Sequence, residues 1–323
     1  MNMVLFNKSY GLNDILDLIE KDKKFVGNEK SVRINNVALR ETHNSSSLDW
    51  CGLDNVSGII KYLKDSKAGL TLVSYVDGWE NISHACNQCN LLFVKSPKLE
   101  FARLFNLFKV SKRRSEFESS NNFTVDQNTL IGDNFVTGSN VVIGNAKIGS
   151  NVEISHNTVI LDGVEIGDNV IIGASSVIGS EGFGYVTDYD GSLLKFPHIG
   201  GVLIGSNVEI GSNVCIDRGS LVNTIIDNGV KIDNLVHIAH NVHIGSDSHI
   251  IANAMIAGSV QIGKRVWIAP SVNILEHLSV GDDAKIGVGS VVTKSVPQGE
   301  TWTGVPAREI SVFLRQQSKL KAL

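Results

Sequence analysis

Three histidines lie close together in the segment KIDNLVHIAHNVHIG, residues 231–245: His237, His240 and His243. A neutral imidazole can accept a proton from a reacting group near pH 7, and imidazole is also a common ligand of zinc. The segment therefore allows a metal site, a general base or ordinary surface histidines. The repeat that carries these residues decides how they can be placed.

An aliphatic residue recurs every six positions through most of the chain. The longest series is Ile226, Ile232, Ile238, Ile244, Ile250, Ile256, Ile262, Ile268, Ile274, Val280, Ile286 and Val292. Earlier series are Ile148, Ile154, Ile160, Ile166, Ile172 and Ile178, then Ile204, Ile210 and Ile216, after a less regular start at Ile131, Thr137 and Ile143. Period six fits neither a helix nor a plain strand alternation. It predicts a parallel β-helix of hexapeptide repeats, in which three hexads close one coil.

The repeat separates the three histidines. His237 and His243 each precede an inward-facing isoleucine, whereas His240 follows Ile238 by two positions. They belong to successive hexads and are expected on different faces of the prism, so a shared metal is not predicted. His240 stays open as either a general base or a solvated surface residue.

Two segments interrupt the hexads, at residues 180–198 and 217–225. A loop that leaves a rigid solenoid usually carries function, although tolerated insertions without a role are the alternative. We expect these two segments to contribute to a site.

Changes of pattern divide the chain into a small α+β domain, a charged linker, the β-helix and a short basic tail, at residues 1–110, 111–124, 125–306 and 307–323. In the first domain we predict a helix from Tyr10 to Lys21, strands in GLTLVSYV and NLLFVK, and a helix from Pro97 capped by Ser96. The tail could hold a short helix.

Composition narrows the function classes. A net charge of −4 argues against nucleic-acid binding, and no apolar run reaches the length of a membrane span. The N-terminus lacks the apolar core of a signal peptide, so we expect a cytoplasmic protein. Cys86 and Cys89 form a single Cys-x-x-Cys without a second cluster, and we read them as reduced thiols.

Five segments resemble the UDP-3-O-acylglucosamine N-acyltransferase family of lipid A and lipopolysaccharide synthesis. They are IGSEGFGY (178–185), KFPHIGGVLIG (195–205), CIDRGSLVNTIIDNGVKIDN (215–234), HIAHNVHIG (237–245) and MIAGSVQIG (255–263). The resemblance extends over nearly the whole chain. It implies a homotrimer of left-handed β-helices whose active sites lie between subunits. It also implies acyl transfer from the phosphopantetheine of acyl carrier protein to the amine of a UDP-linked glucosamine, without a tightly bound cofactor.

The resemblance also implies site residues. The family's general base falls on His240, its thioester-binding backbone N–H on Gly258, and a second histidine on His277. The matching positions expected to bind substrate are Trp50, which would stack on the nucleotide base, and Phe183, Tyr185, Asp217, Arg218, Asn234 and Asn241.

The chain departs from the family at several places. A second base-stacking aromatic, expected near Val56, is missing, and the family's long C-terminal helices are reduced. The ending IGVGSVVTKSVPQGETWTGVPAREI (286–310) resembles acetyl-CoA-dependent hexapeptide acetyltransferases instead. The alternative function is therefore an N-acetyltransferase that uses acetyl-CoA or a short acyl-CoA on another nucleotide-linked amino sugar of O-antigen, capsule or glycan synthesis. A non-catalytic scaffold and a β-helical metal enzyme are hypotheses from other classes.

Overall fold

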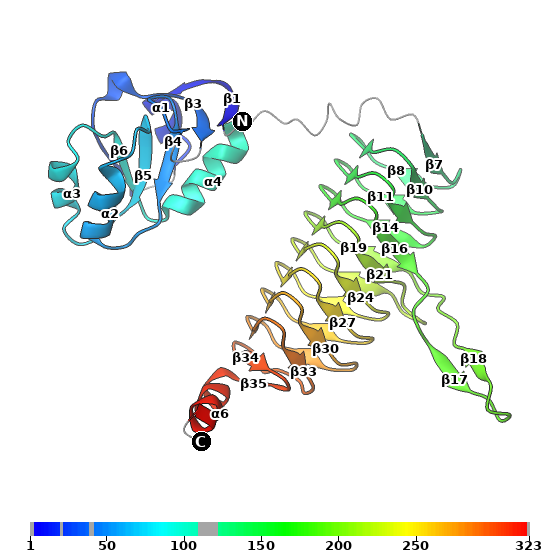
Figure 1. Ribbon diagram of the computed structural model, residues 1–323. Helices are drawn as coiled ribbons and strands as arrows, with labels where there is room; N and C mark the ends of the chain where they lie inside the picture. Colours follow the sequence, from blue (N-terminus) through cyan, green and yellow to red (C-terminus); the bar gives the residue numbers. More distant parts are fainter. Residues whose placement is uncertain (1–2, 20–21, 39–41, 109–121, 322–323) are drawn as a thin grey trace. The chain divides into compact units, whose positions relative to one another are not determined.

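The computed structural model describes residues 3–19, 22–38, 42–108 and 122–321, which form two compact units (Figure 1). The two units divide at Lys112. Most of the predicted linker lies outside the described residues. No helix in these ranges is long and apolar enough to cross a membrane.

The first unit is a small α/β layer structure. Its elements are β1 (Met3–Gly11), α1 (Leu12–Leu16), β2 (Lys24–Val26), η1 (Glu29–Ser31), β3 (Arg33–Ala38), β4 (Leu48–Cys51), α2 (Val56–Leu63), β5 (Leu70–Ser74), α3 (Trp79–Ala85), β6 (Leu91–Val94) and α4 (Pro97–Phe108). The described strands form a sheet in the order β2-β6-β5-β4, and β1 pairs separately with β3. Four of the five residues of β5 and all four of β6 are buried, as expected for parallel strands covered on both faces.

The predicted helix from Tyr10 to Lys21 is wrong in its extent. Tyr10 belongs to β1, where it pairs with Ile34 and stacks on Phe108 with ring centroids 3.6 Å apart. Among the described residues of this segment the helix covers only Leu12–Leu16, and the predicted end at Lys21 lies outside them. Tertiary contacts of the buried tyrosine therefore override its place in a helical pattern.

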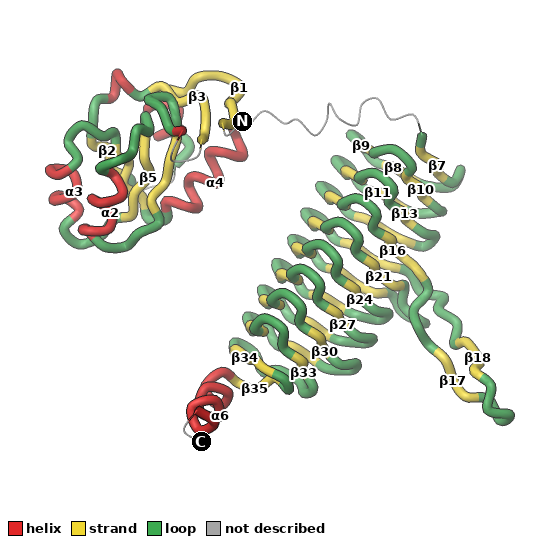
Figure 2. Tube along the Cα trace, viewed as in Figure 1, coloured by secondary structure: helices red, strands yellow, loops and turns green. Residues whose placement is uncertain are grey.

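The second unit is a three-sided parallel β-helix (Figure 2). The first described sheet contains β7 (Phe123–Val125), β10 (Val141–Ile143), β13 (Val159–Ile160), β16 (Val177–Ser180), β21 (Cys215–Asp217), β24 (His237–Ile238), β27 (Met255–Ile256), β30 (Asn273–Ile274) and β33 (Val291–Val292). The second contains β8 (Leu130–Ile131), β11 (Lys147–Ile148), β14 (Val164–Ile166), β19 (Val202–Ile204), β22 (Thr224–Ile226), β25 (His243–Ile244), β28 (Gln261–Ile262) and β31 (Ser279–Val280). The third contains β9 (Val136–Thr137), β12 (Glu153–Ile154), β15 (Ile171–Ile172), β20 (Glu209–Ile210), β23 (Lys231–Ile232), β26 (His249–Ile250), β29 (Trp267–Ile268), β32 (Lys285–Ile286), β34 (Thr301–Gly304) and β35 (Ala307–Glu309).

The aliphatic residue of each hexad points into the prism. Ile216, Ile238, Ile256 and Ile274 stand in register on successive coils and are fully buried. This stack confirms the fold class that the period of six predicts. The buried column also fixes the backbone at each corner, since every coil is hydrogen-bonded to the coils on either side.

Truncating one member of the buried column should destabilise the unit strongly. We expect Ile256→Ala to lower the free energy of unfolding by about 2–5 kcal/mol, because it leaves a cavity in a stack that cannot collapse. Met255→Ala is the matched control, since Met255 lies on the same two-residue strand, is exposed and points outward. Denaturant unfolding monitored by circular dichroism would measure both. Equal losses in the two variants would contradict the stacked-core description.

The two predicted interruptions, residues 180–198 and 217–225, begin at strands of the first sheet and do not disrupt its strand pairing. β16 pairs directly with β21, although the segment between them forms an antiparallel arm of β17 (Tyr185–Thr187) and β18 (Leu193–Lys195). Figure 1 shows this arm projecting away from the coils. The tail is more ordered than predicted, because β35 pairs back onto β34 before helix α6 (Ile310–Lys321).

Candidate active site

His240 lies at the corner between β24 and β25, directly over the next coil. Its carbonyl accepts a hydrogen bond from the Ser259 N–H at 2.9 Å, which ties the two corners together. A Cβ placed on Gly258 would lie 2.7 Å from Cε1 and 2.9 Å from Nε2 of the His240 ring. Only glycine at position 258 therefore lets the imidazole lie against the neighbouring backbone.

The Gly258 N–H is available to a ligand. Within the described residues it donates to no acceptor, whereas the Gly258 carbonyl accepts from the His277 N–H at 3.0 Å. A fixed backbone N–H beside an imidazole is the arrangement that stabilises an oxyanion while a base removes a proton. His277 is exposed, and its charge acts on His240 across the same corner.

A further histidine, His198, contacts His240. His198 comes from the segment after β18, and its ring centroid lies 4.9 Å from that of His240 with an interplanar angle of 60°. It is only 4% exposed. His198 was not among the predicted site residues, although it lies in the KFPHIGG motif that carries the family resemblance.

Asp217 completes the polar cluster at the end of β21. Its carboxylate accepts a hydrogen bond from the Ser180 hydroxyl at 2.8 Å and lies 3.7 Å from His237 Nε2. Burial raises the pKa of Asp217, opposed by the Ser180 hydrogen bond and by the charges of His237, His240 and His198. Asp217 is thus a buried carboxyl group that interacts electrostatically with three imidazoles.

The surroundings of His240 favour its neutral form. Burial lowers the pKa of His240, and the charges of His198 and His277 act in the same direction. Asp217 and Glu276 oppose this shift. The Nδ1 atom of His240 is buried and finds no hydrogen-bond partner among the described residues, so no hydrogen bond at this nitrogen stabilises the imidazolium. A neutral ring at pH 7 is what a general base requires.

The side chains of Arg218 and Asn241 form hydrogen bonds to backbone groups near the site. Arg218 donates from Nε to the Gly179 carbonyl at 2.7 Å and from Nη2 to the Asp162 carbonyl at 2.8 Å. Asn241 Oδ1 accepts from the Ser220 N–H at 2.7 Å, which fastens the second insert to the coil. Both side chains thus hold the backbone of neighbouring segments, Arg218 next to Asp217 in the chain and Asn241 next to His240.

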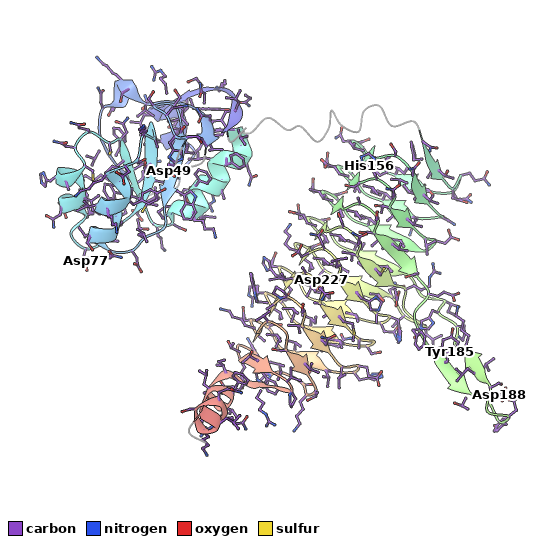
Figure 3. All side chains as sticks on the ribbon, in the orientation of Figure 1. Asp49, Asp77, His156, Tyr185, Asp188 and Asp227 are labelled. Atoms are coloured by element: carbon purple, nitrogen blue, oxygen red, sulfur yellow. The ribbon has the colours of Figure 1, made fainter. Side chains whose placement is uncertain are left out.

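Other predicted binding residues lie elsewhere in the unit. Asn234 lies at the corner between β23 and β24, one corner before that of His240. Its Oδ1 atom accepts a hydrogen bond from the Ser212 N–H at 2.7 Å. Phe183 is 86% exposed and packs edge-on against Tyr185, with centroids 5.1 Å apart. Figure 3 labels Tyr185 on the arm, away from the coils.

Trp50 belongs to the first unit, in β4, and is half-buried against Phe101. It lines a pocket of about 440 Å³ together with Ala38, His43, Asp49, Gly52, Leu53 and Tyr62. The Tyr62 hydroxyl donates to the Asp49 carboxylate at 2.9 Å. The pocket is lined by both aromatic and polar side chains, and of these only Trp50 was predicted to bind substrate.

Within the described ranges, no group of three or more His, Cys, Asp or Glu residues is arranged to hold a metal ion. His237 and His243 project from different sheets, each beside an aspartate: Asp217 at 3.7 Å and Asp227 at 3.1 Å. Burial raises the pKa of both Cys86 and Cys89, which suits unreactive thiols.

Comparison with known proteins confirms the resemblance over part of the chain. Residues 145–180 match the family model "Bacterial transferase hexapeptide (six repeats)". A UDP-3-O-acylglucosamine N-acyltransferase from Methylobacterium sp. (strain 4-46) is 38% identical over 143 residues, which are 44% of this chain and 40% of that protein. The enzyme of that name from Rhizobium meliloti (strain 1021) is 41% identical over 140 residues, 43% and 40% of the two chains. The chain thus spans about two fifths of the length of these curated relatives.

Solved structures support the fold. The UDP-N-acetylglucosamine acyltransferase of Francisella novicida matches with a TM-score of 0.54 and 26% identity, covering 61% of this chain and 72% of that one. The Campylobacter jejuni protein of the same name matches with a TM-score of 0.53 and 23% identity, covering 61% and 76%. These neighbours have the left-handed β-helix, which confirms the handedness that the resemblance implies.

Proposed function

We propose that this protein is an N-acyltransferase that moves an acyl group from a phosphopantetheine thioester to the amine of a UDP-linked amino sugar. The acceptor we favour is UDP-3-O-acylglucosamine, the substrate named for its relatives. The observation that carries the proposal is the His240 imidazole packed against Gly258, whose N–H donates to no acceptor among the described residues.

The chemistry needs only these groups. The sugar amine attacks the thioester carbonyl, and His240 takes the proton that the nitrogen loses. The Gly258 N–H donates to the oxygen that becomes negative as the carbon turns tetrahedral. The carbon–sulfur bond then breaks, the thiolate recovers the proton from His240, and an amide and a free thiol leave. The thioester is already activated, so no acyl-enzyme is required.

The pH dependence follows from the direction of the His240 pKa. Its pKa lies below the ordinary value of a histidine because of burial and the nearby imidazoles. The base form is present above that pKa, so kcat/KM should be level around neutral pH and fall as the pH is lowered through it. A pH–rate profile would measure this. A rate that rises on acidification instead would contradict a neutral His240 as the base.

For the nucleotide, we propose the Trp50 pocket of the first unit. An indole face offers a stacking platform for uracil, and the Asp49–Tyr62 pair offers polar atoms to its edge. This role does not depend on a second aromatic at Val56, because Tyr62 lines the same pocket.

The donor has two candidates. Acyl carrier protein is acidic, and α6 with the residues just before it carries Arg308, Arg315 and Lys319. A coenzyme A thioester is favoured by a pocket of about 300 Å³ at the last coil, lined by Trp302, Lys294 and Arg308. There, a flat ring and two cations would suit an adenine nucleotide with phosphates.

A homotrimer in the cytoplasm is the assembly that we propose. The arm between β16 and β19 exposes Phe183, Tyr189, Leu193 and Ile199, apolar side chains that a second copy of the chain would cover. Light scattering of the purified protein should then give three times the 34.9 kDa chain mass.

A donor–acceptor matrix read by mass spectrometry tests the proposed function. The donors are 3-hydroxyacyl carrier proteins and acetyl-CoA, and the acceptors are UDP-3-O-acylglucosamine and other nucleotide-linked amino sugars. Gain of one hydroxyacyl chain on the acylated glucosamine would establish the proposed reaction. Gain of an acetyl group on another amino sugar would establish the coenzyme A alternative, and no transfer in any combination would overturn both.

A further inference from the structure

We propose that His198 is a positioning residue of the active site, which holds the His240 imidazole over Gly258 and controls its protonation. The role of His240 as the base rests on the proposed function. The contact between the two rings does not depend on it.

The inserted segment is shaped around His198. Its Nδ1 lies 3.0 Å from the Phe196 carbonyl. A carbonyl only accepts, so this contact keeps a proton on Nδ1 and leaves Nε2 as the nitrogen that can gain a second proton. A Cβ on Gly182 would lie 2.7 Å from His198 Nε2 and 2.8 Å from His240 Cδ2. A Cβ on Gly184 would lie 2.9 Å from His198 Cε1. Both glycines of the EGFGY motif therefore admit the buried ring.

His198 differs from the rest of the segment in its burial. Phe183, Tyr185 and Tyr189 are exposed on the arm, whereas His198 is 4% exposed and lies against the coil that carries the base. An arm that only needed an apolar anchor could place one of its many aromatic or aliphatic residues there. Because His198 is an ionisable ring that lies edge-on to His240, it affects the protonation of His240 as well as the position of that ring.

Charged and titratable groups approach His240 from three elements. Asp217 from β21 and Glu276 from the following corner favour the imidazolium. His198 from the insert and His277 from the following corner oppose it, and among these charges His198 has the largest influence. Replacing His198 by a neutral ring should therefore raise the pKa of His240, while a smaller side chain should also release its position.

The experiment compares His198→Phe, which keeps a buried ring but removes the ionisable group, with His198→Ala, which removes both. Carbethoxylation by diethyl pyrocarbonate requires a neutral imidazole, so its rate against pH titrates His240 when the modified peptide is sequenced by mass spectrometry. In His198→Phe we expect the midpoint for His240 to move to higher pH, together with the acidic limb of kcat/KM. In His198→Ala we expect kcat to fall by roughly one to two orders of magnitude, as misplacement of a catalytic group does.

His243 and His249 are internal controls in the same repeat, and their midpoints should not move in either variant. A His240 midpoint and pH profile unchanged in His198→Phe, with full kcat in His198→Ala, would overturn the proposal. His198→Gln, which can still donate to the Phe196 carbonyl, serves if His198→Ala does not fold, and it should also raise the midpoint. Carbethoxylation needs no substrate, so it tests this inference even if the donor–acceptor matrix shows no transfer.

Discussion

Replacing His240 by alanine should lower turnover by about two to four orders of magnitude, which is the usual contribution of a general base. The free energy of unfolding should change little, because the ring lies outside the prism, against Gly258 of the next coil and His198 and Gly182 of the insert. The measurement is single-turnover acyl transfer from the donor that the matrix identifies, with thermal unfolding recorded on the same preparation.

His243→Ala is the matched control for this variant. His243 lies in the same segment but faces outward from β25, where it pairs with Asp227 at 3.1 Å. That pair is partly exposed and contributes little to stability. We expect full turnover and an unchanged unfolding transition. Equal acyl-transfer activity of His240→Ala and His243→Ala would refute the role of His240 as the base.

The β-helix could be predicted from the sequence because each residue of its core packs against the equivalent residue of the adjacent coil. Each inward residue, such as Ile238 or Ile256, meets its equivalent from the adjacent coil, so the period alone determines what each side chain touches. His240 and Gly258 are eighteen positions apart on that period, and their contact follows from the same count. The fold and the contact between His240 and Gly258 were thus accessible without coordinates, whereas the roles of the two residues are implied by the family resemblance and stay a prediction.

The features that could not be predicted from the sequence depend on contacts between residues that the six-residue repeat does not relate. His198 meets His240 only because the insert folds back onto the coil, and nothing in the spacing of the two residues encodes that return. The pocket at Trp50 has the same origin, since His43 and Tyr62 reach it from a loop and from helix α2. The prediction for Tyr10 failed for a similar reason. Its stacking partner, Phe108, lies at the other end of the unit's sequence, so the local pattern around Tyr10 does not reveal the contact.

Gly258→Ala should lower kcat by roughly a hundredfold, the effect expected when a catalytic group is misplaced by about 1 Å. The backbone at Gly258 is not in the left-handed region, so alanine is tolerated there and keeps the N–H that we assign to the oxyanion. The loss would come from the new Cβ, 2.7 Å from His240 Cε1, which forces the ring away. Gly299→Ala is the control, because its φ of +72° strains the backbone while its Cβ meets nothing within 4 Å.

A double variant separates this clash from other effects of Gly258. If the added methyl acts by displacing the imidazole, it has nothing to displace once His240 is alanine. The combined variant should then be no slower than His240→Ala alone, and the two single losses should not add. Additive losses would instead mean that alanine at position 258 obstructs the thioester itself, with the His240 ring unmoved. Comparing kcat/KM for the four proteins with one donor distinguishes displacement of the base from obstruction of the donor.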